Sequence, residues 1–311
     1  MFFSQVFQSI DITRKYMSTA KSLLKWILRF VLLYVLFIIF FIIGSLAVAG
    51  VIPDNAKSEP GLVSPESGLL IIALVHLLII STLIMTSRWS GWKLAISLAI
   101  SYYGTVTFLM QIETWYFLSS ITVGPALLLR LFLMGIPTAF LFIPIAVWVL
   151  GKGHPPIASS TNPVLVMSAQ QWIGRFTLLA LIYIVLYWCA GYFIAWQNPE
   201  LRAFYGQPGE VQPFFTNTLD TLRNDPLFFL FQIFRALIWI ACAVPIIRGS
   251  NLNRAWTMVL VGLFFSVPQN VLHTIANPLM PYASVRLSHM IETASSTFLF
   301  GVIVVWVLRR K

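Results

Sequence analysis

Residues 30–51 have the sequence FVLLYVLFIIFFIIGSLAVAGV, an apolar run of 22 residues without a charged side chain. A helix needs about 20 consecutive apolar residues to cross the hydrocarbon core of a bilayer. The run lacks a clear small-residue cleavage site before the next apolar segment, so we expect a permanent span rather than a cleaved signal. With its flanking residues, this stretch predicts a first transmembrane helix over 28–51.

Seven further segments are comparably long and apolar. They are 67–87, 94–118, 124–150, 172–196, 226–247, 255–275 and 286–308. Only helices and closed barrels satisfy their backbone polar groups inside lipid. Continuous apolar runs of this length favour helices. The sequence therefore predicts an all-α, polytopic integral membrane protein with about eight transmembrane helices.

The composition agrees with this class and excludes others. The chain of 311 residues is 59% hydrophobic and only 10% charged, whereas soluble domains carry about 25% charged residues. The net charge of +10 does not indicate nucleic-acid binding, because the basic residues lie at the ends of apolar runs rather than on a polar domain. The expected partner is the lipid bilayer.

Basic and acidic residues alternate between the gaps that separate the apolar runs. Every second gap holds basic residues, accompanied by Asp11 alone: Arg14, Lys15, Lys21, Lys25, Arg29, Arg88, Lys93, Lys152, Arg175, Arg248, Arg254, Arg309, Arg310 and Lys311. The other gaps hold most of the acidic residues. Because cytoplasmic loops are rich in Lys and Arg, we expect a multi-pass protein of the plasma membrane with both termini cytoplasmic.

The chain divides into four parts on this scheme. These are a cytoplasmic or interfacial N-terminal segment (1–27), a first four-helix half (28–150), a cytoplasmic linker (151–171) and a second four-helix half (172–311). Residues before Lys15 could form a short surface helix, and the long outer loop could carry another near 218–224. The halves end in similar phrases, AVWVLGK at 146–152 and VVWVLRR at 304–310. This similarity suggests a 4+4 parallel repeat. The alternative is that any two four-span units that obey the positive-inside rule look alike.

Ionisable side chains within the spans are costly and by default mark function or internal pairing. They gather mostly near the outer ends of the spans, and polar faces on spans seven and eight accompany them. We infer a polar cavity in the outer leaflet, lined by spans three, four, seven and eight, with Arg235 at its floor. The candidate ligand-binding residues are Glu113, Arg130, Arg235, Gln269, Asn270, His273, Arg286, His289 and Glu292.

The charges of these residues suggest what the cavity binds. Three arginines within spans face two glutamates, which leaves one positive charge. A guanidinium suits a carboxylate or phosphate, so the expected ligand is an anionic or lipid-like small molecule. The alternative is that Arg130 or Arg286 reaches the headgroups and needs no partner.

Metal and catalytic patterns are weak. His289 and Glu292 lie one helical turn apart, and His273 with Glu113 could complete a metal site, but no His-Glu-x-x-His motif supports it. Nothing in the spacing singles out a pair of haem ligands, so no cofactor is strongly implied. The chain lacks a recognisable nucleophile motif and a phosphate-binding glycine loop, which leaves open whether it is an enzyme.

Three functions fit these features. The first is binding or transport of an anionic or amphipathic small molecule through the outer cavity, and we favour it. The second is a membrane-embedded enzyme that acts on a lipid-linked substrate with a His/Glu site. The third is a non-catalytic membrane subunit with protein partners in a larger complex.

Overall fold

The computed structural model describes residues 2–51, 57–154 and 165–309. Within these ranges the regular structure is helical, and eight helices are long and apolar enough to cross a membrane, which confirms the predicted fold class. The spans, numbered in chain order, are Ser22–Ser45, Pro65–Met85, Gly91–Leu118, Pro125–Val149, Ala169–Ala195, Leu227–Gly249, Arg254–Thr274 and Ala283–Leu308.

Four spans are single helices and four contain a change of helix type. The single helices are α1 (Phe2–Ser45), α2 (Pro65–Met85), α10 (Leu227–Gly249) and α12 (Ala283–Leu308). The composite spans are α3 (Gly91–Tyr103), η1 (Gly104–Phe108) and α4 (Leu109–Leu118); α5 (Pro125–Met134), η2 (Pro137–Phe142) and α6 (Ile143–Val149); α7 (Ala169–Ala190) and η3 (Gly191–Ala195); and α11 (Arg254–Asn270) and η4 (Val271–Thr274). The loop before α10 carries α8 (Pro199–Phe204) and α9 (Phe214–Asn224), so the short helix expected near 218–224 is present as part of α9.

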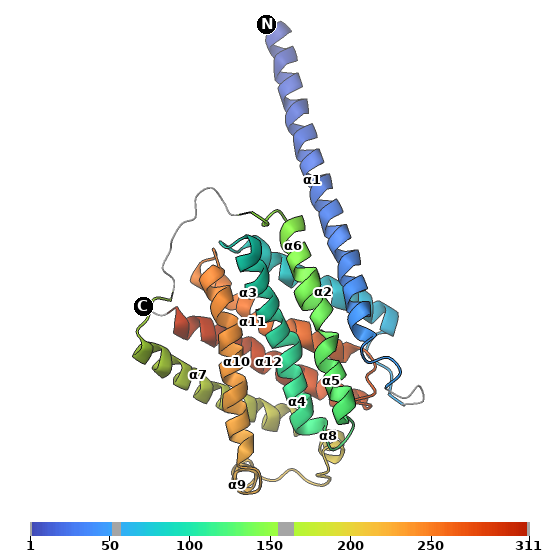
Figure 1. Cartoon of the computed structure of the whole chain (residues 1–311), viewed down its shortest axis with the longest axis vertical. Coiled ribbons are helices and arrows are strands. Elements are labelled where there is room, and N and C mark those ends of the chain that lie inside the picture. The colour runs from blue at the N-terminus through green and yellow to red at the C-terminus, as the bar shows by residue number, and fades with distance from the viewer. Residues whose placement is uncertain (1, 52–56, 155–164, 310–311) are drawn as a thin grey trace.

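The first helix differs from the sequence-based expectation at both ends. Residues predicted to form a separate surface helix belong to α1, which is continuous from Phe2 and projects beyond the bundle (Figure 1). Its C-terminal end is Ser45 rather than Val51. The chain turns through residues 46–51, and Gly50 adopts a φ of +72°, a left-handed conformation that cannot continue the helix.

Helix packing follows the same pattern in the two halves. The first span packs on the second and fourth spans, and likewise the fifth packs on the sixth and eighth. The third packs on the fourth, as the seventh packs on the eighth. Between the halves, α3 contacts α10 and α2 contacts α11. The hydrophobic core therefore runs continuously through both halves.

Two short turns join the halves at one end of the bundle. Arg88 N donates to Gly249 O at 2.6 Å, and Asn251 N donates to Thr86 O at 2.8 Å. These bonds surround an isolated antiparallel β-bridge between Ser87 and Ser250. The turn after the second span thus pairs with the turn after the sixth span. We call this end the turn end.

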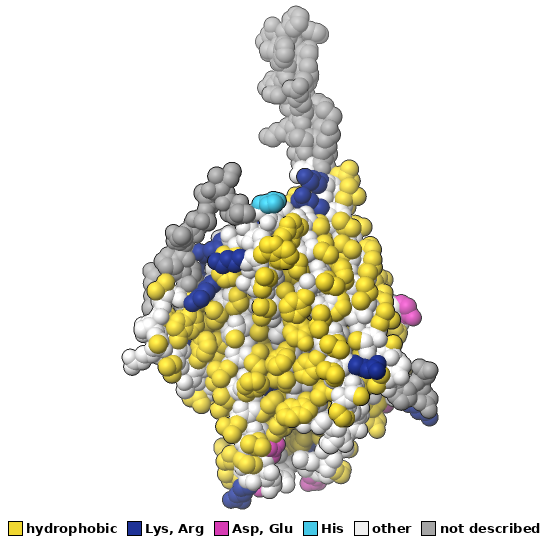
Figure 2. Space-filling model, viewed as in Figure 1, with side chains coloured by type: hydrophobic (Ala, Val, Ile, Leu, Met, Phe, Trp, Pro, Cys, Tyr) yellow, Lys and Arg dark blue, Asp and Glu magenta, His cyan; other side chains and the backbone are white. Residues whose placement is uncertain are grey.

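The surface agrees with a membrane environment. Hydrophobic side chains cover most of the visible flank of the bundle, while most visible Lys and Arg residues lie near the end where α1 leaves it (Figure 2). Exposed large side chains such as Leu129, Leu181 and Leu230 lie on several spans. A flank of this composition is stable against acyl chains and unstable against water.

The helices α11 and α12 approach each other closely at a point where two glycines meet. A Cβ placed on Gly301 would lie 2.8 Å from the Cα of Gly262. Small residues at such crossings let the backbones of membrane helices approach and gain dispersion contacts.

We expect Gly301→Val to destabilise the fold by about 1–3 kcal/mol, because the added methyl groups must separate α11 from α12. Thermal unfolding in detergent would show this as a lowered Tm. Gly174→Val on α7 is the matched control, because no neighbouring heavy atom lies within 4 Å of a Cβ added there. Equal Tm values for the two variants would contradict the close-contact interpretation.

Candidate functional site

Three spans from both halves bring ionisable side chains together in the interior, away from the turn end. Glu113 comes from α4, Arg235 from α10, and His289 and Glu292 from α12. We call these four residues the ionisable cluster. The fifth span completes its surroundings with Tyr187 of α7.

The centre of the cluster is an ion pair. Arg235 Nη2 lies 2.5 Å from Glu113 Oε2, with the arginine 2% exposed and the glutamate 21% exposed. Arg235 Nη1 also donates to Gln232 Oε1 at 2.9 Å, and Tyr187 donates to Glu113 Oε1 at 3.4 Å. The guanidinium carbon lies 5.1 Å from the Tyr187 ring centroid. A charge this deep is stable only because carboxylate, amide and aromatic groups surround it.

A second chain of contacts leads from a loop to the other carboxylate. The Tyr205 hydroxyl lies 3.0 Å from His289 Nε2, and His289 Nδ1 lies 3.3 Å from Glu292 Oε2. Burial raises the pKa of the Tyr205 hydroxyl, so it remains a donor. With neutral His289, the tautomer that satisfies both contacts accepts at Nε2 and donates from Nδ1. Tyr205, His289 and Glu292 thus form a hydrogen-bonded relay.

The seventh span joins the cluster through polar contacts. Thr293 donates to Asn270 Oδ1 and also to the carbonyl of His289 at 2.6 Å. The Asn270 amide donates to Ser266 O at 2.7 Å. Asn270 thereby fixes the turn of α12 that carries His289 and Glu292.

The charge balance of the assembled cluster differs from the sequence-based count. Glu113, Glu292 and Arg235 interact electrostatically with one another. Two carboxylates facing one guanidinium have a formal charge of −1 when both are ionised. In a low-dielectric interior this charge requires a proton or a cation, so the cluster itself has no positive charge in excess.

Arg286 lies apart from this cluster and has a structural environment. Its guanidinium, in a residue 1% exposed, donates to five oxygen atoms of two loop segments. The acceptors are Ser58 Oγ at 3.2 Å and the carbonyls of Met280, Pro281, Glu59 and Pro60 at 2.8–2.9 Å. Arg286 thus joins the segment before α2 to the segment before α12 and needs no anion.

Three other candidates are not brought into the hydrogen-bonded cluster. Arg130 is exposed and makes one long bond, 3.4 Å, to Ala47 O. Gln269 is buried and donates to Phe265 O within its own helix. His273 is half-buried and interacts electrostatically with His289 and Arg286. The fourth span, predicted to line the site through Arg130, therefore gives it no charged group.

The proposed metal ligands do not converge. In the described ranges, no three His, Cys, Asp or Glu side chains are arranged to hold a metal ion. His273, His289, Glu292 and Glu113 lie on three different helices, and only His289 and Glu292 make direct contact. The one-turn spacing on α12 therefore produces a hydrogen-bonded pair.

Sequence reasoning missed the tyrosines. Tyr187 contacts Glu113, and Tyr205 contacts His289. A signal was present on the fifth span, where Tyr183 and Tyr187 lie one turn apart on a single face of the apolar C-terminal half of α7. No comparable signal marked Tyr205, because the path of its loop decides where it lies.

No protein-family model, no curated protein and no solved structure matches this chain. We therefore infer the function from the chemistry of the ionisable cluster.

Proposed function

We propose that this protein is a proton-linked membrane transporter of an anionic or amphipathic small molecule. The carrying observation is that Glu113 pairs with Arg235, while a second interior carboxylate, Glu292, interacts electrostatically with both groups without contacting the guanidinium. One exchangeable proton near His289 and Glu292 makes the cluster neutral. An anionic ligand that displaces Glu113 from Arg235 must bring a further proton for the released carboxylate. Anion binding and proton uptake are coupled by this charge balance.

Unsatisfied polar atoms support a ligand or water in the same place. Arg235 Nε and Gln232 Nε2 are buried and have no hydrogen-bond partner in the described part of the chain. Buried polar groups of this kind are normally paired. Because both lie beside the Glu113 ion pair, we assign the ligand to this side of Arg235.

The relay supplies a route for the proton. Tyr205 lies on the loop between the fifth and sixth spans, and its contact with His289 leads to Glu292. A histidine between a loop hydroxyl and an interior carboxylate can accept a proton at one ring nitrogen and donate one from the other.

The arrangement in the membrane is part of the proposal. The turn end carries Arg88, Lys152 and Arg254, and we place it in the cytoplasm of a plasma-membrane protein. The matched helix packing and the Ser87–Ser250 bridge support two parallel four-helix repeats.

A carboxyl proton shared within the ionisable cluster is the first expected result. Infrared difference spectra of the protein in lipid nanodiscs, recorded between acid and alkaline pH, should contain a buried carboxyl band that Glu292→Gln removes, because Glu113 alone then balances Arg235 and no proton is needed. The neutral isostere keeps hydrogen bonding, so this variant should still fold. Glu210→Gln, at an exposed loop position, should keep the band. A band that survives Glu292→Gln would place the exchangeable proton elsewhere.

Transport is tested with liposomes that contain the protein and an internal pH indicator. A panel of small carboxylates and phosphate esters is added outside. The proposal expects at least one anion to acidify the lumen with the wild type and not with Glu292→Gln. Equal proton fluxes in both proteins for every compound would reject proton-linked transport.

A second candidate is general acid–base catalysis on a lipid-linked substrate. The Tyr205–His289–Glu292 relay favours it, because a hydroxyl, an imidazole and a carboxylate in sequence can move a proton at a reacting group. Turnover of a supplied lipid-linked substrate that is lost in His289→Gln would support the enzyme over the transporter.

A further inference from the structure

A second set of charged side chains, separate from the ionisable cluster, gathers at the turn end. Arg309 follows α12, Arg254 begins α11, and Arg88 lies in the turn after α2. Arg309 Nη1 donates to Thr257 Oγ1 at 2.8 Å and to Leu252 O at 3.2 Å. Arg254 Nη2 donates to Trp306 O at 2.7 Å, and Arg88 Nη2 donates to Ser250 O at 2.6 Å. Three guanidinium groups therefore surround one turn.

These arginines repel one another. Burial, and then the charges of Arg88 and Arg254, lower the pKa of Arg309, although an arginine side chain stays charged at neutral pH. The segments that meet here, 86–93, 150–154 and 248–254, contain no Asp or Glu. For Arg254 and Arg309 the acceptors in the described structure are all neutral oxygen atoms. The site therefore holds positive charge that an anion would stabilise.

Unused donor capacity points the same way. Arg254 Nε is buried and has no hydrogen-bond partner within the described residues. A guanidinium has five N–H donors in a planar fork that fits two oxygen atoms of a phosphate. In the described structure, the Arg254 guanidinium donates to one carbonyl, that of Trp306. Its other N–H groups can therefore donate to a phosphate.

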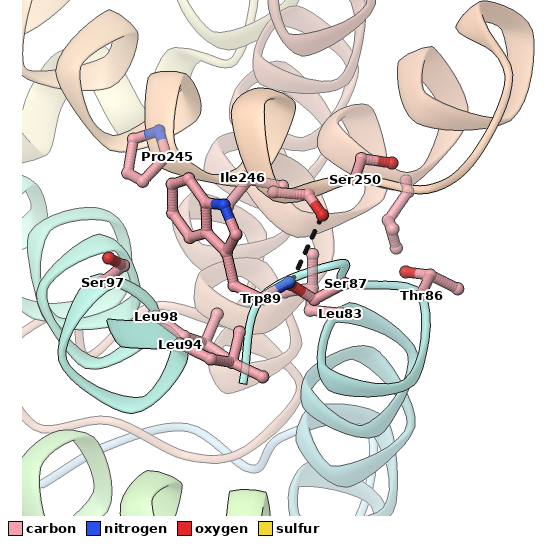
Figure 3. A pocket seen from close by; sticks show the side chains of 12 residues that line it. Leu83, Thr86, Ser87, Trp89, Leu94, Ser97, Leu98, Pro245, Ile246 and Ser250 are labelled. Atoms are coloured by element: carbon pink, nitrogen blue, oxygen red, sulfur yellow. Dashed lines mark hydrogen bonds between the residues drawn. The ribbon is translucent and has the colours of Figure 1, made fainter. Parts of the chain in front are cut away.

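A small pocket lies at the same turn. Leu83, Leu94, Leu98, Pro245, Ile246 and Leu260 line it. Trp89 extends into this space beside Pro245, and Ser87 and Ser250 lie along it (Figure 3). Most of the lining side chains are buried, so the pocket is too small for an acyl chain. On the outer surface, Trp256 and Trp306 are exposed beside Arg254 and offer apolar contacts to a lipid.

We propose that the turn end is a binding site for an anionic phospholipid, with its phosphate on Arg254 and Arg309 and its acyl chains against the exposed Trp256 and Trp306. This site is independent of the proposed transport activity. Basic pockets between transmembrane helices bind lipid headgroups through the same charge complementarity.

Native mass spectrometry of the full chain, titrated with phosphatidylglycerol or phosphatidylcholine, tests the proposal. We expect phosphatidylglycerol to bind roughly tenfold or more tightly than phosphatidylcholine, given the attraction of an anionic lipid to two arginines. The double variant Arg254→Gln/Arg309→Gln should lose most of this preference. Arg223→Gln, at an exposed position on α9, removes a similar charge elsewhere and should keep it.

Two further measurements distinguish loss of charge from misfolding, and lipid binding from binding of the headgroup alone. Arg254→Lys/Arg309→Lys retains both charges, so it should keep part of the preference if the glutamine variant loses it through charge rather than misfolding. Glycerol phosphate, which has the headgroup chemistry without acyl chains, should compete weakly. An unchanged preference in the glutamine double variant, or full competition by glycerol phosphate, would overturn the lipid site.

Discussion

Glu113→Gln is expected to destabilise the folded protein by about 3–5 kcal/mol, because it removes the carboxylate in direct contact with the buried Arg235 and leaves the more distant Glu292, which forms no ion pair with the guanidinium in the described structure. The side chain of Arg235 is 2% exposed, and its strongest contact is the 2.5 Å ion pair with Glu113. A neutral amide can accept a hydrogen bond but cannot balance the charge. The measurement is the free energy of unfolding in detergent or, where unfolding is irreversible, the shift in Tm.

The double variant Glu113→Gln/Arg235→Gln is the decisive comparison. It removes both charges together, so it should recover most of the stability lost in Glu113→Gln. Arg235→Leu alone should cost less than Glu113→Gln, because the remaining carboxylate can take up a proton. Additive effects of the two single substitutions would show that the pair does not act as a unit.

Arg286→Met should have the second large effect. It deletes the five hydrogen bonds that Arg286 donates to the segments before α2 and α12. A hydrogen bond to a charged group contributes about 1.5–3 kcal/mol, and these bonds act together, so we expect a total loss of several kcal/mol rather than their sum. Limited proteolysis should cut the loop at 57–64 faster in the variant, and the Tm should fall.

Arg130→Met provides the control for Arg286→Met. Arg130 is also an arginine near a span end, but it is exposed and has one long contact. Its replacement should change stability by no more than about 0.5 kcal/mol. Arg286→Lys should lie between the two, since three donors on a single nitrogen cannot reach all five acceptors. If Arg286→Met behaved like Arg130→Met, the clamp on the two loops would be energetically unimportant.

Counting the charged residues in the spans indicated one unpaired arginine and hence an anionic ligand. The structure gives Arg286 and Arg235 different partners, which that count did not consider. Both are arginines inside apolar runs, and both have the same desolvation cost in isolation. Arg286 is solvated by backbone carbonyls of loops distant in sequence, whereas Arg235 pairs with Glu113 from another span. Neither partner can be read from the local sequence, because both depend on how segments far apart are brought together.

The sequence by itself determined the features that depend on neighbouring residues. The lengths and apolarity of the runs predicted eight helices, since partition into lipid and backbone hydrogen bonding depend on about 20 neighbouring residues. The polar positions on α12 were also visible, and the contact between His289 and Glu292 follows from one helical turn. Tertiary structure alone decided that Glu113 meets Arg235, that Tyr205 reaches His289, and that Arg130 stays at the surface. These contacts require the relative rotation of four helices and the path of one loop, which are set by packing of the whole bundle.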